Sequence, residues 1–232
     1  MARDDAHDAL RDILVRGTLH AWASHQPGAR AMRGRGTTWA TALPSGQPVA
    51  VRHSLHGGML AAVTRDLFLT PTRAPHELAG ALRLAAAGVR TPAVLGFAVY
   101  AATGPLCRAD VVTELLDGTD LVSALRERQA PTDREEIAGA VRRLLDGLAA
   151  AGALHPDLNA RNILLLHDAS PSAAAVLDVD RVRFVPGAGV AAQNAARLQR
   201  SLRKAHAAGD FAATDDDVAA LTSAPAGAAR SA

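Results

Sequence analysis

One short segment constrains this sequence more than any other feature. Residues His155–Asn162 read H-P-D-L-N-A-R-N, the spacing H-x-D-L-x-x-x-N, and Asp178 follows sixteen residues after Asn162 within V-L-D-V-D. Apolar runs border both acidic positions, with I-L-L-L after Asn162 and A-V-L before Asp178. Such runs beside polar loop residues predict two paired strands. The hairpin would bring two carboxylates and an amide to one edge.

This set of side chains suits phosphoryl transfer. Asp157 would orient the acceptor hydroxyl and take its proton. Asp178 would hold Mg²⁺ against the β- and γ-phosphates, and Asn162 would add a neutral oxygen, because Mg²⁺ prefers hard oxygen ligands. His155 is expected to brace the loop by hydrogen bonding. Asp and Asn are also ordinary turn residues, a reading that fits Asn162 alone but not the whole spaced set.

Upstream features agree with this chemistry, although each is weaker alone. Gly34 and Gly36 precede a predicted strand, as a flexible loop over phosphates requires, but a lone G-x-G is as often a simple turn. Val49–Arg52 resembles the V-A-I-K strand whose basic residue contacts the α- and β-phosphates, with Arg52 in place of Lys. Arg forks onto phosphate oxygens and stays charged. Glu77, on a predicted helix, is the natural partner of Arg52.

The order of predicted elements indicates an α+β fold with two lobes. An alternating hairpin covers 37–54 around Pro44, Ser45 and Gly46, and a helix from Pro75 to Ala87 has Leu78, Leu82 and Ala85 or Ala86 on one face. Strands are expected at Val94–Tyr100 and Ala109–Leu116. A helix starts at Thr132, which has capping-box spacing to Glu135, and another covers Ala191–Ala207.

From this order we expect an N-terminal lead-in at 1–31, a β-rich N-lobe at 32–116, a small and mostly helical C-lobe at 117–210, and a disordered tail at 211–232. The fifty or so residues after Asp178 leave no room for a full activation segment and a large helical subdomain. Regulation by loop phosphorylation is therefore not expected.

Composition narrows the class of protein. The net charge of +2 over 232 residues gives no strongly basic field, and nucleic acid is not expected as a partner. A single cysteine, Cys107, excludes an internal disulfide framework. The charged start M-A-R-D-D-A-H-D lacks the apolar run of a secretory signal, and no stretch approaches the roughly 20 apolar residues that cross a bilayer. We expect a cytoplasmic protein.

Longer motifs make the resemblance more specific. R-H-x-x-x-G-G at 52–58, R-A-D-x-x-T-E at 108–114 and D-L-N-A-x-N at 157–162 are similar to the 3-deoxy-D-manno-octulosonic acid (Kdo) kinases. These belong to the lipopolysaccharide core kinases, within the protein-kinase-like fold. The resemblance runs from about Gly34 to Lys204.

The resemblance implies an ATP-dependent kinase of a Gram-negative bacterium that phosphorylates the 4-hydroxyl of Kdo in a lipid A precursor. It would be peripheral on the cytoplasmic face of the inner membrane, with no obligate protein partner. It implies Asp157 as the base, Asn162 and Asp178 as ligands of Mg²⁺, Arg52 as the phosphate-binding cation and Glu77 as its partner. The backbone of Glu114 would contact adenine.

The sequence departs from the family pattern at three places. Pro156 replaces the usual Ala and stiffens the loop. Val179 replaces the Phe between the two acidic residues, and D-V-D lacks the Gly of D-F-G, so switching by a flip of this segment is not expected. Leu55 and His56 replace the aromatic and basic residues often found before Gly57 and Gly58, which bears on the acceptor more than on catalysis.

Two further interpretations stay open, and one hypothesis concerns the membrane. The catalytic loop does not encode the acceptor, so a kinase acting on another small molecule or on a protein fits the same residues, as does a nucleotide-binding pseudokinase. Four cations recur at helical spacing near the C-terminus and could hold the acidic sugar-lipid or anionic headgroups: Arg197, Arg200, Arg203 and Lys204. They equally fit a solvated helix face.

Overall fold

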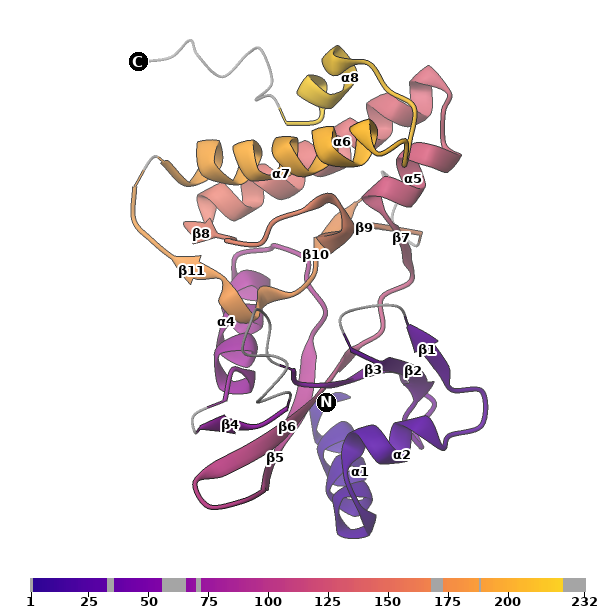
Figure 1. The fold of residues 1–232 in the computed structure, drawn as a ribbon, viewed down its shortest axis with the longest axis vertical. Coiled ribbons are helices and arrows are strands. Elements are labelled where there is room, and N and C mark those ends of the chain that lie inside the picture. Colours follow the sequence, from indigo (N-terminus) through magenta and orange to yellow (C-terminus); the bar gives the residue numbers. More distant parts are fainter. Residues whose placement is uncertain are drawn as a thin grey trace. The chain divides into compact units, whose positions relative to one another are not determined.

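The computed structural model describes residues 2–32, 36–55, 66–69, 72–167, 173–187 and 189–222 (Figure 1). The chain forms two compact units. Unit 1 comprises residues 1–79 and 92–115, and unit 2 comprises residues 80–91 and 116–232. Gly57 and Gly58, together with His56, lie outside the described residues.

Unit 1 is built on an antiparallel sheet. The order is β1-β2-β3-β6-β4, and β5 also pairs with β6. Alternating apolar residues form the inner face, with Val49 and Val51 fully buried on β3. The strands are β1 (Arg30–Met32), β2 (Thr38–Ala42), β3 (Pro48–His53), β4 (Phe68–Leu69), β5 (Val94–Ala101) and β6 (Leu106–Glu114).

The predicted hairpin and the two later strands are confirmed. Strands β2 and β3 pair antiparallel, with Trp39 opposite Val51, and the turn between them contains Gly46 at a φ of 86°. Strands β5 and β6 are joined by a turn that includes Gly104 at a φ of 58°. Both glycines occupy the left-handed region that other residues adopt only with strain.

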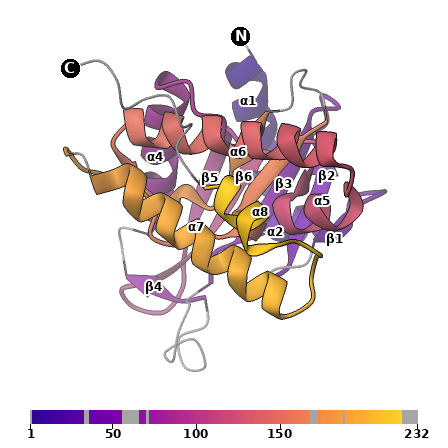
Figure 2. The same ribbon diagram turned by 90° about the horizontal axis from the view of Figure 1, so that it is seen from above.

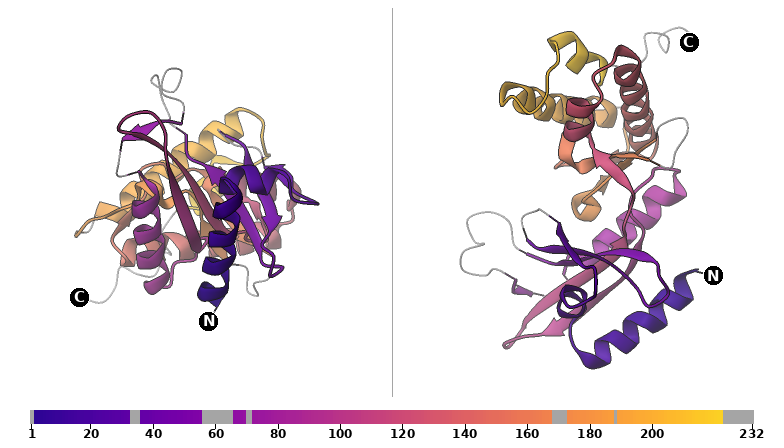
Figure 3. Two further views of the ribbon diagram at one scale, coloured as in Figure 1. Left: turned by 90° about the horizontal axis from the view of Figure 1, so that it is seen from below. Right: turned by 90° about the vertical axis from the view of Figure 1, so that its right-hand side faces the viewer.

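The N-terminal segment is part of the core of unit 1. Helix α1 (Ala2–Arg16) and helix α2 (Leu19–Ser24) cover the sheet, and α1 lies along β5 in both views of Figure 3. The cluster that they form with the sheet includes Leu10, Ile13 and Leu19. The sequence analysis assigned these residues only to an N-terminal lead-in, because their apolar positions are interspersed with charged ones.

Helix α4 (Ala74–Ala86) confirms the predicted helix but not its predicted face. Leu82 is 41% exposed, whereas the buried positions are Ala74, Glu77, Ala81 and Leu84. A buried glutamate interrupts the apolar pattern of this face, so periodicity alone selected the wrong side. Gly88 follows at a φ of 75°, as expected for a residue that ends a helix.

The described part of unit 2 contains two long helices, two short ones and two small sheets. Helix α6 packs on α7 and on the sheet β7-β9-β10, and Figure 2 shows the two long helices running beside one another. The strands are β7 (Gly118–Asp120), β8 (Ala153–Leu154), β9 (Ile163–Leu166), β10 (Ala174–Val176) and β11 (Arg183–Phe184), and the helices are α5 (Leu121–Glu127), α6 (Pro131–Ala150), α7 (Gly189–Ala207) and α8 (Asp215–Ala220).

In unit 2, the buried positions of α6 were predicted correctly, but the start of this helix was not. Ile137, Val141 and Leu148 are fully buried on α6, as the period predicted. The helix, however, begins at Pro131 after Ala130, which provides no side-chain cap, so the predicted capping box of Thr132 and Glu135 is wrong. Proline at the first helical position sets the required φ and lacks only an N–H that has no helical partner.

Helix α8 lies within the segment expected to be disordered from residue 211. Thr214 and Asp217 form a capping box, in which each side chain accepts from the other residue's backbone N–H. Phe211, Val218 and Leu221 are buried. These three apolar side chains supply enough buried surface to order a short helix. No helix in the described part of the chain has the length and apolarity to span a bilayer.

Candidate active site

The loop from His155 to Asn162 is held by hydrogen bonds within itself. Asn159 Oδ1 accepts from the N–H groups of Arg161 and Asn162, at 3.0 and 3.1 Å, and so caps the short helical turn Ala160–Asn162. The amide nitrogens of Asn159 and Asn162 both donate to the carbonyl oxygen of Asp157, at 3.0 and 3.2 Å. The backbone of Asp157 and the side chain of Asn162 are therefore fixed relative to each other.

The hairpin of β9 and β10 brings Asp178 to this loop. Ile163 is paired with Val176, and the N–H of Leu177 donates to the carbonyl of Asn162 at 2.8 Å. Asp178, next along the chain, adopts φ 54° and ψ 54° and is the one described residue other than glycine with a positive φ. The backbone of Asp178 thus follows directly on a residue that is hydrogen bonded to Asn162, and Asn162 is bonded to the Asp157 carbonyl.

His155 connects the loop to the same strand end. It is fully buried, and its Nε2 lies 3.0 Å from the carbonyl oxygen of Leu177. A carbonyl only accepts, so Nε2 carries the hydrogen and donates. The expectation that His155 braces the loop is confirmed.

Arg181 is a site residue that the sequence analysis missed. Its guanidinium donates to the Asp157 carboxylate at 3.1 Å, and both side chains are partly exposed. The short helical turn Val179–Arg181 places it there. Val179, the middle residue of D-V-D, is buried at 4% exposure. The sequence D-V-D-R contained a signal for this contact, because Arg181 lies only three residues after Asp178 and the sequence analysis assigned it no role.

The donor set fits a magnesium ion. The amide nitrogen of Asn162 donates to the carbonyl of Asp157, which leaves Oδ1 as the atom that could coordinate a metal. Asp178 is exposed, and no donor within the described residues pairs with its carboxylate. One carboxylate and one amide oxygen match the few protein ligands that Mg²⁺ takes when phosphates and water complete its shell.

Unit 1 contains the predicted ion pair. Arg52, on β3, donates to Glu77, on α4, at 2.5 Å. The Glu77 side chain is only 7% exposed, whereas that of Arg52 is 31% exposed. A buried carboxylate is stable only when paired, so the ion pair with Glu77 holds Arg52 in place.

The remaining predicted residues of unit 1 are placed less completely. Gly34 lies outside the described residues. A Cβ on Gly36 would come within 2.4 Å of Leu55 Cδ1, so a side chain there requires Leu55 to move. The N–H of Glu114 donates to the carbonyl of Ala93 at 2.8 Å. A backbone contact from Glu114 to adenine would therefore use its carbonyl oxygen.

Comparison with known proteins decides the family. The model of the lipopolysaccharide kinase (Kdo/WaaP) family matches residues 20–224. This chain belongs to that family. Among its relatives is the 3-deoxy-D-manno-octulosonic acid kinase of Actinobacillus succinogenes, 33% identical over 180 residues, covering 74% of this chain and 73% of the relative. The kinase of the same name from Xylella fastidiosa is 30% identical over 201 residues, covering 84% and 77%.

A solved structure agrees on the fold. The present chain matches the solved structure of WaaP in complex with acyl carrier protein with a TM-score of 0.55 and 22% sequence identity. The match covers 87% of this chain and 79% of the other. The predicted α+β, protein-kinase-like fold is confirmed, as is the family predicted from the R-H-x-x-x-G-G, R-A-D and D-L-N-A-x-N motifs.

Two of those family motifs meet in a polar network inside unit 1. The Asp110 carboxylate is fully buried and accepts from His53 Nδ1 at 2.5 Å, from the Tyr100 hydroxyl at 3.0 Å and from the His20 N–H at 2.9 Å. His53 Nε2 lies 3.2 Å from Asp66. The sequence analysis placed His53 and Asp110 in family motifs but assigned neither a role. Both ring nitrogens of His53 contact a carboxylate. Because the groups bonded to Asp110 come from β3, β5 and α2, the network ties these three elements to β6.

The network makes the stability of unit 1 depend on pH. The hydrogen bond to Asp110 raises the pKa of His53, helped by Asp66 and opposed by burial. Burial alone would raise the pKa of Asp66, but hydrogen bonds from Arg108 and His53 outweigh it and lower that pKa. Because the pKa of His53 is higher in the folded state, its contribution is complete below the unfolded value near 6.5 and disappears as pH rises through the folded value.

We expect His53→Gln to lower the unfolding free energy by about 1.5–3 kcal/mol at pH 6, the usual range for a hydrogen bond to a charged group. The difference from wild type should shrink as the pH rises from 6 to 9. Thermal denaturation at several pH values measures it, and His76→Gln, at an exposed position on α4, is the control. A difference that grows toward pH 9 would contradict the assigned protonation of His53.

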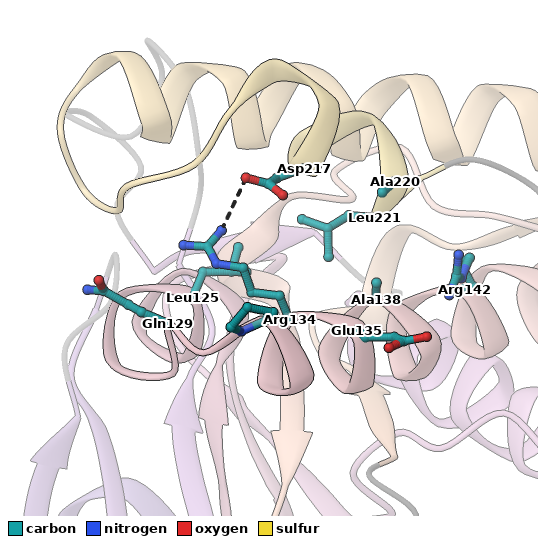
Figure 4. Close-up of a pocket in the computed structure, with 10 residues that line it drawn as sticks. Leu125, Gln129, Arg134, Glu135, Ala138, Arg142, Asp217, Ala220 and Leu221 are labelled. Atoms are coloured by element: carbon teal, nitrogen blue, oxygen red, sulfur yellow. Dashed lines mark ion pairs between the residues drawn. The ribbon is translucent and has the colours of Figure 1, made fainter.

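A separate pocket of about 520 Å³ lies in unit 2 (Figure 4). Leu125 and Leu221 form part of its apolar wall, and Arg134, which is paired with Asp217 at 3.7 Å, and Arg142 line it as well. None of the predicted site residues that the structure describes lines this pocket. The candidate active site is therefore defined by the Asp157 loop and not by this pocket.

Proposed function

We propose that this chain is an ATP-dependent kinase that phosphorylates the 4-hydroxyl of Kdo in a Kdo-lipid A precursor. The observation that carries the proposal is that Asn162 is hydrogen bonded both to the Asp157 carbonyl and to the N–H of Leu177, the residue before Asp178, in a member of the lipopolysaccharide kinase family. The Kdo kinase names of the relatives support the acceptor.

Each residue has one task in the proposed reaction. Asp157 accepts a hydrogen bond from the acceptor hydroxyl and takes its proton as the oxygen attacks the γ-phosphorus. The bond between the γ-phosphorus and the bridging oxygen breaks, and ADP leaves. Arg181 holds the Asp157 carboxylate in one orientation. Arg52, fixed by Glu77, binds phosphate oxygens.

Asn162 Oδ1 and the Asp178 carboxylate would hold Mg²⁺, which neutralises charge on the β- and γ-phosphates when bound. Gly34 and Gly36 would lie along the nucleotide phosphates, and the Glu114 carbonyl would contact adenine. The boundaries 32–116 and 117–210 for an N-lobe and a C-lobe belong to the same proposal.

The direct test is mass spectrometry of Kdo-lipid A precursor incubated with the protein, Mg²⁺ and ATP. The expected product carries one added phosphate, about 80 Da, on the Kdo ring. Parallel reactions with an aminoglycoside and a generic protein substrate separate this acceptor from other kinase activities. Transfer to one of those acceptors instead would overturn the proposed acceptor, and binding of ATP without transfer to any would indicate a pseudokinase.

We also propose a peripheral location on the cytoplasmic face of the inner membrane. Three of the four predicted cations are exposed on α7, namely Arg200, Arg203 and Lys204. Each contributes about 1 kcal/mol near an anionic surface. Arg197 is excluded from this role, because its guanidinium donates to the carbonyl of Pro156 at 2.9 Å.

Sedimentation with vesicles tests the location. Anionic vesicles should retain the wild type more strongly than neutral ones, and neutralising Arg200, Arg203 and Lys204 together should remove the difference. Equal retention of the wild type by both kinds of vesicle would contradict the proposal.

A further inference from the structure

One face of helix α7 is hydrogen bonded to the backbone of the loop that carries Asp157. Asn194 is fully buried; its Oδ1 accepts from the N–H of His155 at 3.1 Å, and its Nδ2 donates to the carbonyl of Ala153 at 2.9 Å. One side chain thus satisfies a donor and an acceptor on either side of Leu154. Buried backbone groups need such partners, since leaving one unpaired costs as much as a lost hydrogen bond.

Two further side chains on α7 continue along the same loop. Arg197 donates from one terminal nitrogen to the carbonyl of Pro156 at 2.9 Å, and Ser201 Oγ accepts from the N–H of Ala160 at 3.0 Å. The spacing of 194, 197 and 201 places all three on one face of a helix. The contacts fall at Ala153, His155, Pro156 and Ala160, so they bracket Asp157 on both sides.

The placement of Arg197 indicates that this contact is specific. Its Nε is buried and has no hydrogen-bond partner within the described residues, which is unfavourable for a group that water would otherwise satisfy. A solvated cation on a helix surface would avoid that cost. The helix itself is anchored by Val190, Leu198 and Leu202, which are buried independently of these polar contacts.

We infer that Asn194, Arg197 and Ser201, here called the α7 stripe, are positioning residues that set the place of the Asp157 carboxylate. This inference rests on the proposed function, in which Asp157 is the base. Arg181 orients the exposed Asp157 carboxylate, whereas the backbone on either side of Asp157 sets the position from which that side chain extends. The side chains of the α7 stripe hold that backbone in place through their hydrogen bonds.

The substitutions that test the inference leave the apolar packing of α7 intact. Arg197→Met keeps the aliphatic stem and removes the donors, and Ser201→Ala removes the acceptor for Ala160. We expect kcat to fall about 10- to 100-fold in Arg197→Met, since a displacement near 1 Å of a catalytic group has effects of that size. The KM for ATP should stay within about twofold, because the Asn162 and Asp178 contacts are untouched. Arg197→Lys should recover part of kcat.

The control is Gln193→Ala, which removes an exposed polar side chain next to Asn194 on the same helix. Hydrogen exchange adds a readout that does not require turnover. In Ser201→Ala the Ala160 amide should exchange faster, and in Asn194→Ala the His155 amide should do so. A kcat that stays at the wild-type value while these amides exchange faster would overturn the inference, as would equal losses in kcat and in ATP affinity.

Failure of the proposed function has a different signature. If the wild type transfers no phosphate to Kdo-lipid A precursor, the acceptor proposal falls, and the exchange rates of the Ala160 and His155 amides decide the anchoring alone. Unchanged rates in Ser201→Ala and Asn194→Ala would then overturn it, and faster rates would support it.

Discussion

Asp157→Ala is expected to lower kcat by about 10²–10⁴-fold, the usual contribution of a positioned general base. ATP affinity should remain within about twofold, because the groups proposed to hold the nucleotide are Arg52, Asn162 and Asp178. Asp157 is exposed and pairs with Arg181 at the surface, so its removal should shift the melting temperature little. Steady-state turnover with Kdo-lipid A precursor and calorimetric titration with ATP measure the two effects separately.

The matched control is Asp146→Ala, which removes an exposed carboxylate on α6. It should leave kcat unchanged. If Asp157→Ala keeps more than about a tenth of wild-type turnover, Asp157 is not the base that the mechanism requires.

Substitution of Asp178 should have the second large effect, and on a different step. Without its carboxylate the magnesium would keep only the Asn162 oxygen from this pair, so affinity for Mg-ATP should fall at least about tenfold and turnover should drop with it. Titrations with nucleotide in Mg²⁺ and in EDTA measure this affinity. The nucleotide affinity of the variants should be lower than that of the wild type in Mg²⁺ and equal to it in EDTA.

The backbone of Asp178 dictates two variants instead of one. At φ 54° and ψ 54°, Asn is tolerated, whereas Ala costs about 1 kcal/mol or more. Asp178→Asn and Asp178→Ala should therefore lower the affinity for Mg-ATP by similar factors. Only Asp178→Ala should also lower the melting temperature. Full Mg-ATP affinity in Asp178→Asn would show that the carboxylate does not bind the metal.

Strong local patterns explain which parts of the fold could be predicted. Three features are each encoded by residues close together in the sequence. They are the hairpin around Gly46, the helical periodicity of Ile137, Val141 and Leu148, and the spacing from Asp157 to Asn162. The convergence of Asn162 with Asp178 was also predictable, since a two-stranded hairpin joins apolar runs that are close in sequence.

The errors occurred where distant partners decide the outcome. The buried face of α4 depends on Glu77, which is buried because Arg52 lies opposite it on another strand. Likewise, the role of the partly buried His53 depends on Asp110, fifty-seven residues away. Arg197 appeared to be a surface cation because its acceptor, the carbonyl of Pro156, is a backbone atom that no side-chain pattern reveals.

The hydrogen bond from the Leu177 amide to the Asn162 carbonyl has an evolutionary implication. Asn162 itself accepts this bond, and Asp178 follows its donor by one residue, just beyond the ladder of β9 and β10. Backbone geometry therefore sets the separation of the two proposed metal ligands. Surfaces that select the acceptor can then diverge among related enzymes without altering this separation. Substrate preference and phosphate chemistry are in this way free to change independently of each other.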